Sequence, residues 1–433
     1  MSISEITSGA IEKIKKPAGR SRSIAILTLI LGAFTTIIFG FGCASGTKSI
    51  LTFNPTNLTG VIPPHLGDLS LPSRTSCLLL GILIIAIGLE TLIRRPTKVL
   101  MVRFGGSAIL FVLGLLIWTV RAPGPALFGA INLTAVLVGS SALTMVLIFG
   151  ALSGVMCERA GVVNIAIEGQ FIGGAFFGSM IASTTHNFIL AALAGALLGA
   201  LLGLILAFLS LRYLSDQIIV GVVLVTMLAS LSSYLNVQVL SPYPQYNTGN
   251  LAPKLALPFL AKIPVLGPVL FNQNAFFYLM IILVGVISFA LFKTRYGLRV
   301  RAVGEHPKAA ESVGIDVIKT RYINVVLGGA IAGIGGVAFM ASYGQFQPGY
   351  TSGLGYIALA ALIFGRWRPS GAVVASVIFG ISVYLANNLQ TYRVPVAPAI
   401  LEMFPYIITI GVVAGLIGRV RAPAADGQPY KRD

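Results

Sequence analysis

The sequence predicts an all-α membrane protein, a polytopic helix bundle that crosses a bilayer about twelve times. Of its 433 residues, 56% are hydrophobic and only 10% are charged, and the mean hydropathy is +0.90. Several stretches run without a charge for about 18 residues or more, the length that an α-helix needs to cross ~30 Å of hydrocarbon. Basic residues gather between these stretches, as they do in the short loops of membrane proteins.

The apolar segments place the expected spans in order along the chain. They lie near 25–43, 77–93, 104–120, 131–154, 162–183, 188–210, 218–239, 275–292, 323–343, 354–366, 370–388 and 402–418. The basic stretch before the first span indicates an uncleaved first helix rather than a signal sequence. Segment 354–366 is too short for a comfortable crossing, so we expect a tilted helix, or a broken helix that lines a cavity.

The basic residues also orient the spans. Loops 94–103 and 293–322 are rich in Lys and Arg, whereas the long loop 240–274 holds only Lys254 and Lys262. Because cytoplasmic loops carry the excess of basic residues, both chain termini are predicted to be cytoplasmic and loop 240–274 external. The same rule accounts for the net charge of +17, so no nucleic-acid partner is expected.

Composition narrows the chemistry as well. The three cysteines, Cys43, Cys77 and Cys157, have no spacing typical of metal ligands, so no metal site is expected. Cys43 and Cys77 fall near the external side, where a disulfide is conceivable but reduced thiols are favoured. The sequence has no GxxxxGK[ST] phosphate loop, and the chain is therefore not expected to hydrolyse ATP by itself.

Glycines at four-residue spacing predict close helix packing. Gly195, Gly199 and Gly203 share a face of one span, and Gly329 and Gly333 form a GxxxG pair on another. Such faces let helix backbones approach closely in a membrane, where lipid supplies no hydrophobic drive. Ordinary packing is the favoured interpretation, and a helix that slides during a conformational change is the alternative.

The segment CERAGVVNIAIEGQ at 157–170 is unusually polar for a position beside a span. On a helix starting near residue 161, one face would hold Gly161, Asn164, Glu168, Ala175 and Ser179. This face would point into the bundle, because polar side chains avoid lipid. Asn164, Glu168 and Gln170 would then form either a buried hydrogen-bond network or a polar pathway or gate, and both interpretations stay open.

Two other acidic residues receive structural interpretations. Glu90 lies four residues before Arg94 at the inner end of a span, which favours an interfacial ion pair. Asp216 directly precedes the apolar run 218–239 and is expected to cap its helix.

The segment RYGLRVRAVGEHPKAAESVGIDVIKTR at 295–321 is too polar to enter the bilayer. A proline suits the first turn of a helix, which predicts a short helix made of Pro307, Lys308, Ala309, Ala310, Glu311 and Ser312. Its small side chains would leave a shallow face that fits a groove of another protein. Gly304 and Gly314 would allow a sharp turn at each end. A plain polar loop with one helical turn is the alternative.

This segment resembles the ATPase-docking loop of ABC importer permeases, whose signature is EAA followed by three residues and Gly. KAAESVG at 308–314 keeps the Ala-Ala and the Gly but places Lys308 in the acidic position. Together with ERAGVVNIAIEGQ, DQIIVGVVL and GYIALAALIFGRWRPSGA, it makes the chain similar to permeases of the branched-chain amino acid, simple sugar and nucleoside group. The pair ERAGVVNI and RAVGEHPKAAESVGI most resembles nucleoside permeases of the guanosine or purine type.

The resemblance covers roughly residues 131–420 and implies an organisation for the whole chain. Residues 1–103, with two spans, would be an N-terminal extension, residues 104–420 a permease core of nine to ten spans, and residues 421–433 a cytoplasmic tail. The chain would be a pore-forming subunit of an ATP-driven importer in the plasma membrane of a bacterium. It would move a nucleoside inward by alternating access.

The resemblance also implies partners and site residues. A cytoplasmic ATPase would hold ATP and Mg²⁺, while this chain would bind no cofactor, and an external substrate-binding protein or lipoprotein would deliver the solute. A second, non-identical permease subunit would complete the pore in the lipid bilayer.

The ATPase-coupling loop would comprise Gly304, Glu305, Pro307, Lys308, Ala309, Ala310 and Gly314. Uncharged amides suit a nucleoside, so Asn387, Asn388 and Gln390 at the outer end of a span would join Asn164, Glu168 and Gln170 as pathway candidates. Helix capping explains those three amides equally well.

Two alternatives stay open. One is a permease of the same group for a sugar or a branched-chain amino acid. The other is an ion-coupled secondary transporter that uses Glu168 as its coupling carboxylate, since intramembrane acids serve that role.

Overall fold

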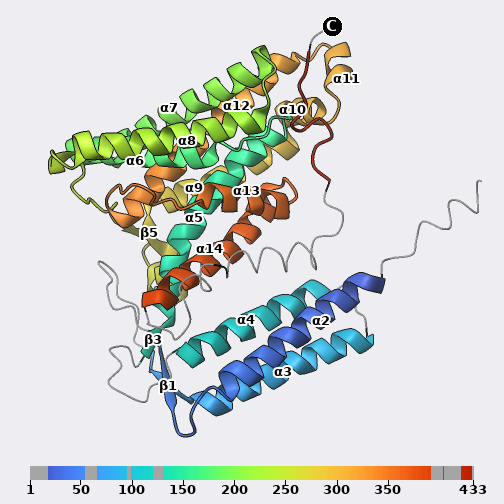
Figure 1. Cartoon of the computed structure of the whole chain (residues 1–433), viewed down its shortest axis with the longest axis vertical. Coiled ribbons are helices and arrows are strands. Elements are labelled where there is room, and N and C mark those ends of the chain that lie inside the picture. The colour runs from blue at the N-terminus through green and yellow to red at the C-terminus, as the bar shows by residue number, and fades with distance from the viewer. Residues whose placement is uncertain are drawn as a thin grey trace, which may run out of the picture. The chain divides into compact units, whose positions relative to one another are not determined.

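The computed structural model describes residues 18–53, 66–94, 99–119, 130–391, 403 and 421–431. The expected span at 402–418 lies outside the described residues, apart from Met403. The chain divides into two compact units, shown in Figure 1. The first unit comprises residues 1–54, 65–133 and 388–418, and the second comprises residues 55–64, 134–387 and 419–433.

The described part of the first unit contains three long helices and a small sheet. Its helices are α2 (Ala18–Phe34), which continues into the π-helical turn η2 (Thr35–Gly40), α3 (Ser73–Arg94) and α4 (Leu100–Thr119). Its strands are β1 (Lys48–Thr52), β2 (Leu69–Pro72) and β3 (Ala130–Asn132), with β1 antiparallel to β2 and parallel to β3. The predicted all-α class omitted these strands, which pair backbone groups of connecting segments that would otherwise lack partners.

The structure confirms two predictions for the first unit, namely the reduced cysteines and the ion pair of Glu90. Cys43 and Cys77 are buried thiols rather than halves of a disulfide, and they lie in one cluster with Phe39 and Trp118. Glu90 forms the expected ion pair with Arg94, at 3.4 Å. It also pairs with Arg103 of α4, at 2.8 Å, so the carboxylate joins two helices as well as two turns of one helix.

The second unit holds the other described α-helices, except for the first residue of α5 and the last residues of α14, which belong to the first unit. They are α5 (Leu133–Glu158), α6 (Ile167–Thr185), α7 (Phe188–Ala207), α8 (Gln217–Leu235), α9 (Ala275–Lys293), α10 (Arg295–Glu305), α11 (Pro307–Ser312), α12 (Val317–Tyr343), α13 (Leu354–Phe364) and α14 (Pro369–Thr391). A hairpin of β4 (Lys254–Ala256) and β5 (Asn272–Asn274) lies in the long loop before α9. Asp216 caps α8, accepting from Ile218 N at 2.8 Å, as predicted.

Nine helices in the described part of the chain are long and apolar enough to cross a membrane. They fall on nine of the expected spans, which confirms a mostly helical, membrane-spanning architecture. Two further expected spans correspond to α6, which has the length but not the apolar composition, and to α13, which is only 11 residues long. The short helix expected at 354–366 is therefore present.

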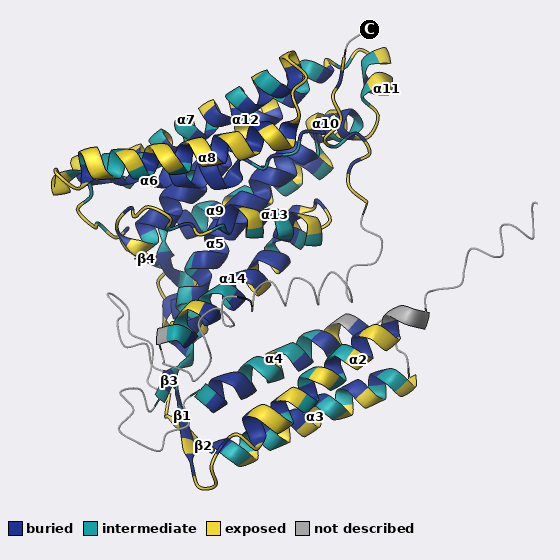
Figure 2. Ribbon diagram, viewed as in Figure 1, coloured by how far each residue is buried: buried dark blue, intermediate teal, exposed yellow. Residues whose placement is uncertain are grey.

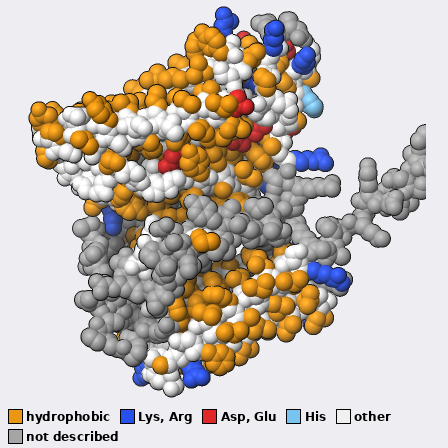
Figure 3. Space-filling view, in the orientation of Figure 1, with side chains coloured by type: hydrophobic (Ala, Val, Ile, Leu, Met, Phe, Trp, Pro, Cys, Tyr) orange, Lys and Arg blue, Asp and Glu red, His pale blue; other side chains and the backbone are white. Residues whose placement is uncertain are grey.

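Helices α5 and α12 form the core of the second unit. In their most apolar stretches 72% and 67% of the residues are buried, compared with 33% in α7 and α8. Figure 2 shows this difference in a mostly dark-blue α5 and a largely yellow α8. The exposed side chains on the outer helices are mostly hydrophobic, as Figure 3 shows for one face, and this is the surface that a lipid environment favours.

The predicted glycine contact joins α7 to α12, which run side by side (Figure 1). A Cβ atom built on Gly199 would lie 2.1 Å from Gly329 O, and one built on Gly333 would lie 2.0 Å from Gly195 O. Neither distance leaves space for a methyl group, so the two backbones pack directly on each other. Close packing by the GxxxG faces is thus confirmed, and sliding of the helices stays a prediction.

The helix expected to start near residue 161 starts only at Ile167. Gly161 adopts a left-handed conformation, with φ of +85°, and Val162 N donates to Cys157 O at 3.1 Å. A left-handed glycine followed by such a bond ends a helix, here α5. The prediction of one continuous face from Gly161 to Ser179 is wrong, because Asn164 lies in the connection between α5 and α6.

Candidate functional site

Glu168 holds the beginning of the short helix α13. Its side chain, only 5% exposed, lies in the first turn of α6. Oε1 accepts from Thr351 Oγ1 at 2.6 Å and from Gly353 N at 3.0 Å, and Oε2 accepts from Gly355 N at 2.6 Å. The first backbone N–H groups of a helix lack partners within the helix and carry its positive end, so a carboxylate is stabilised there.

The backbone of α13 approaches α6 closely at this contact. A Cβ atom on Gly355 would lie 2.5 Å from Glu168 N and 2.8 Å from Glu168 Oε2. Only glycine therefore allows the first turn of α13 to reach the carboxylate. Neither Thr351 nor Gly355 was among the residues singled out from the sequence.

The loop 344–353, between α12 and α13, is held at its other end by a second set of bonds. Asn247, from the long loop before α9, accepts from Phe346 N at 2.9 Å and donates to Phe346 O at 2.9 Å. Ser179 of α6 donates to the same Asn247 Oδ1 at 2.5 Å. Helix α6 thus fixes both ends of the loop, through Glu168 and, by way of Asn247, through Ser179.

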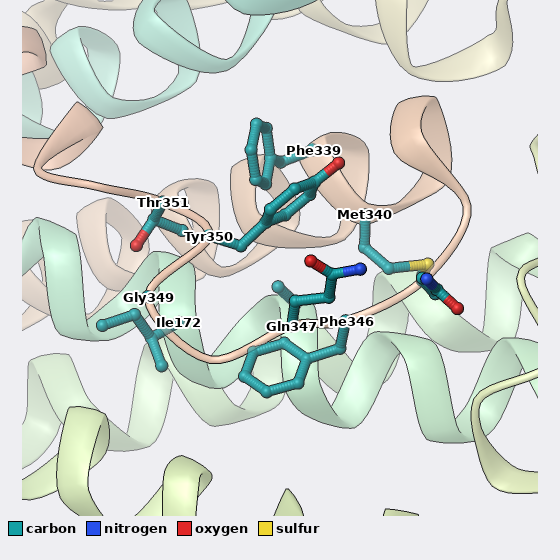
Figure 4. A pocket seen from close by; sticks show the side chains of 10 residues that line it. Ile172, Phe339, Met340, Phe346, Gln347, Gly349, Tyr350 and Thr351 are labelled. Carbon is teal, nitrogen blue, oxygen red and sulfur yellow. The ribbon is translucent and has the colours of Figure 1, made fainter. Parts of the chain in front are cut away.

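A pocket lies between this loop, α6 and α12 (Figure 4). It is a small hollow with a cavity volume of about 10 Å³, enough for one water molecule. It is lined by Ile172, Ala175, Phe339, Met340, Gln345, Phe346, Gln347, Gly349, Tyr350 and Thr351. None of these ten residues is charged. The rings of Phe339 and Tyr350 lie together, with centroids 4.8 Å apart, while Gln345 and Gln347 are exposed. The lining combines aromatic faces with uncharged amides.

Asn164 and Gln170 form a separate buried contact. Asn164 Nδ2 donates to Ser153 Oγ at 3.2 Å and to Gln170 Oε1 at 3.1 Å, which joins the end of α5 to α6. Both amide side chains are fully buried, and Asn164 Oδ1 and Gln170 Nε2 have no hydrogen-bond partner among the described residues. The expected polar residues therefore divide into this contact and the Glu168 contact, and no hydrogen bond described here joins the two.

The three amides near residue 390 lie at the end of α14. Asn387 is exposed, and Asn388 and Gln390 are half-buried. Asn387 belongs to the second unit, whereas Asn388 and Gln390 belong to the first, so the structure does not place these two with Glu168. Their role in a pathway stays a prediction.

The expected short helix in the polar loop is α11, with Pro307 at its first position. Ala310 is buried, in a cluster with Val303 and Val317, which turns one side of α11 toward the rest of the unit. The opposite side is open and carries Lys308, Ala309, Ser312, Val313 and Gly314 as exposed residues. Val313 is 74% exposed, so an apolar side chain faces outward beside small ones. Figure 3 shows Lys and Arg side chains gathered at this end of the unit.

The two glycines expected to bracket α11 differ in role. Gly314 adopts φ of +81° with open space around it, as a sharp turn requires. Gly304 instead lies within α10, where a Cβ atom would come within 2.2 Å of Arg159 O. The prediction of a turn at Gly304 is therefore wrong. A glycine is required at this position because α10 approaches the end of α5 closely.

Arg159, which directly follows α5, also belongs to this region. Its Nε donates to Trp367 O at 2.8 Å, and its guanidinium lies over the Phe292 ring, 5.6 Å from the centroid. Burial lowers the pKa of Arg159 from its usual value, and the nearby Glu305 partly opposes this. The arginine joins the end of α5 to the connection between α13 and α14.

Comparison with known proteins identifies a family and several relatives of this chain. The family described as branched-chain amino acid transport system, permease component, matches residues 136–413. The nucleoside ABC transporter permease protein NupC of Lactococcus lactis is 36% identical over 296 residues, which cover 66% of this chain and 92% of that protein. The guanosine ABC transporter permease protein NupQ of Bacillus subtilis is 38% identical over 299 residues, again 66% of this chain and 92% of that protein.

A sugar permease matches over the same share of the chain. The putative glucose ABC transporter permease protein TsgC13 of Haloferax volcanii is 31% identical over 316 residues, which cover 66% of this chain and 94% of that protein. No solved structure matches the chain.

Proposed function

This chain belongs to the family of permease components of branched-chain amino acid transport systems, and we propose that the solute it carries is a nucleoside. As such a component it is a multi-pass membrane subunit of an ABC importer and is not the ATPase itself. The relatives named for nucleoside and guanosine transport are 36% and 38% identical to it, compared with 31% for the relative named for glucose. This likeness is the observation that carries the proposal.

The side chains beside loop 344–353 have the chemistry that the same solute requires, although the hollow that they line is smaller than a nucleoside. A nucleoside has a flat aromatic base and a ribose without charge, which aromatic rings and amides can bind. An amino acid carries an ammonium and a carboxylate, and burying these without partners costs much free energy. The positive end of α13, which could have bound a carboxylate, is already occupied by Glu168. We infer that the solute passes Gln345, Gln347 and Tyr350.

We infer twelve crossings with both termini in the cytoplasm. The nine long helices, α6, α13 and the apolar segment 402–418 account for the crossings, with residues 1–103 as an N-terminal extension of the permease core. The basic segment that contains α10 and α11 then falls on the cytoplasmic side, and the loop before α9 falls outside.

The cytoplasmic segment is where we place the ATPase. The open side of α11, with Ala309, Ser312 and Val313 exposed, supports a groove-binding contact with that partner, which would hold ATP and Mg²⁺. Lys308 occupies the position where an acidic residue is usual, so the partner should offer it an acidic or neutral neighbour. An external substrate-binding protein and a second, non-identical permease subunit complete the proposed importer.

An ion-coupled transporter has less support. A coupling carboxylate must gain and lose a proton or ion, whereas both oxygens of Glu168 accept hydrogen bonds from α13 and its loop. Uptake that stops with a protonophore while ATP is preserved would nevertheless favour that alternative.

The test is uptake of labelled guanosine by cells with and without this gene, with ribose and leucine measured alongside. We expect the loss of guanosine uptake alone. We also expect the double variant Gln345→Ala/Gln347→Ala to weaken the apparent affinity for guanosine about three- to tenfold, the effect of one or two hydrogen bonds. Gln238→Ala, an exposed amide in the turn after α8, is the matched control. Loss of ribose or leucine uptake instead would overturn the nucleoside assignment.

A further inference from the structure

The C-terminal residues 421–431 lie against the proposed ATPase-docking segment (Figure 1). Ala425 N donates to Gly304 O at 2.9 Å, and Ala424 N donates to Glu305 Oε2 at 3.2 Å, so the tail is bound to the end of α10. The Tyr430 hydroxyl donates to the Glu311 carboxylate, which binds the tail to α11. Its ring joins the cluster of Val303, Ala310 and Val317.

The same residues of the tail surround Arg321, which belongs to the first turns of the central helix α12. Arg321 is fully buried. Its Nη1 donates to Gln428 O at 3.0 Å, its Nη2 lies 3.5 Å from Ala425 O, and its guanidinium faces the Tyr430 ring at 5.8 Å. A buried cation is stable only where acceptors surround it, and the tail supplies the acceptors that the structure describes.

The tail also reaches the end of α5, the other central helix. The carboxyl group of Asp426 lies against that of Glu158, whose Oε2 accepts from Trp367 Nε1 at 2.5 Å. Gly161, which ends α5, has no room for a side chain, because a Cβ atom would lie 2.8 Å from Arg321 Nη2 and 3.0 Å from Ala425 O. One short stretch, residues 424–430, therefore contacts α5, α10, α11 and α12.

We propose that residues 424–430 are a coupling strap, which transmits movement of α11 to the central helices α5 and α12. This rests on the proposed docking of an ATPase on α11. The strap binds the inner side of α11 through Ala310 and Glu311 and leaves the outer side, with Val313, open to the partner. A hollow lined by Gly314, Val317 and Tyr430 lies beside the contact, which gives α11 space to shift.

Besides the strap, the described contacts that join α11 to α12 include the turn at Gly314 and the packing of Ala310 on Val317. A helix of six residues is too short to be stable on its own, so its position depends on its contacts with the strap and with the rest of the unit. The strap is tied to α11 by the hydrogen bond from Tyr430 to Glu311. Its carbonyls and the Tyr430 ring face Arg321 of α12, and Ala425 O lies beside Gly161 at the end of α5. Tyr430 and Arg321 act here as positioning residues, since neither faces the solute or ATP.

The experiment compares the wild-type chain with Tyr430→Ala and with a chain that ends after Pro423. Each is expressed with the partner ATPase, the second permease and the binding protein, and reconstituted in liposomes. Three quantities are measured, namely co-purification of the ATPase, ATP hydrolysis and guanosine uptake. We expect co-purification to persist, while uptake per ATP hydrolysed falls by at least about fivefold, within the range usual for coupling between sites.

Tyr430→Phe is the conservative variant, because it keeps the ring in the cluster and loses only the hydroxyl. We expect it to restore part of the coupling that Tyr430→Ala loses. Unchanged uptake per ATP in Tyr430→Ala would overturn the strap, as would a loss of uptake in proportion to the loss of bound ATPase. If the wild-type chain itself binds no ATPase, the proposed function fails instead, so the two failures are distinguishable.

Discussion

The Glu168 carboxylate and the Gly355 amide nitrogen, 2.6 Å apart, join α6 to the first turn of α13 across 187 residues of sequence. Two more bonds, from Thr351 and Gly353, complete the contact. A helix of 11 residues is too short to be stable on propensity alone, so its position depends on such contacts. The loop that lines the pocket ends at the same residues, and its shape therefore depends on Glu168.

Replacing Glu168 tests this dependence. We expect Glu168→Ala to leave buried N–H and O–H donors without acceptors, at a cost of about 3 kcal/mol or more in the free energy of unfolding. Glu168→Gln keeps the shape and one acceptor oxygen, so it should cost less. Thermal stability of the purified chain and guanosine uptake per inserted molecule are the measurements. Equal behaviour of the two variants and the wild type would show that the contact does not hold α13.

Local sequence signals predicted several elements of this fold and site correctly. Pro307 marked the start of α11, Asp216 marked the start of α8, and the glycine spacing on α7 and α12 marked their contact. Each of these signals acts within a few residues, or through a repeat on one helix face. Such patterns can be recognised in a single sequence.

The contacts that build the site were not predictable in the same way. Arg321 looked like one of several loop cations, yet it is fully buried against backbone carbonyls more than a hundred residues away. Carbonyls carry no side-chain signature, so no residue pattern marked Gln428 or Ala425 as its partners. The sequence pattern placed Gly161 on a helix face. In the structure Gly161 has a left-handed conformation and lies against Arg321, a residue distant in sequence that no local pattern marks as its neighbour.

The close contact between α7 and α12 predicts that adding one methyl group at Gly199 lowers the stability of the protein. Gly199→Ala would place a methyl group 2.1 Å from Gly329 O, which is backbone and cannot move aside alone. We expect a loss of roughly 1–3 kcal/mol in stability from the forced separation of the helices. Gly285→Ala on α9 is the matched control, because nothing lies within 4 Å of the added atom. Thermal unfolding in detergent compares them, and similar midpoints would argue against direct backbone packing.

The open side of α11 predicts a charge-sensitive docking contact. Val313 is 74% exposed and follows α11 directly, so Val313→Asp should fold normally. We expect it to lower co-purification of the partner ATPase by about tenfold, since a buried unpaired charge at an interface costs 1.4 kcal/mol or more. Lys262→Ser, in the loop before α9, is the control for an unrelated surface change. If the ATPase co-purifies fully with Val313→Asp, the docking site lies elsewhere on the chain.

Asp426 predicts that docking of the tail depends on pH. Burial raises the pKa of Asp426 to about 7, and this rise is partly opposed by a hydrogen bond with Glu158, the charge of Arg321 and the Gly427 N–H. The pKa is thus higher in the docked tail than the usual 3.8, so the docked state binds the proton more tightly. Docking is favoured at low pH and weakens as the pH rises through about 7.

Hydrogen exchange of residues 424–430 measures this dependence directly. Protection factors, which remove the intrinsic effect of pH on exchange, should be higher near about pH 6 than near about pH 8 in the wild-type chain. Asp426→Asn is neutral at both values, so its protection should not change with pH and should be at least as high as that of the wild-type chain at the lower pH. Asp68→Asn changes an exposed carboxylate of the other unit and should keep the wild-type dependence. If Asp426→Asn still loses protection as the pH rises, another group controls the tail.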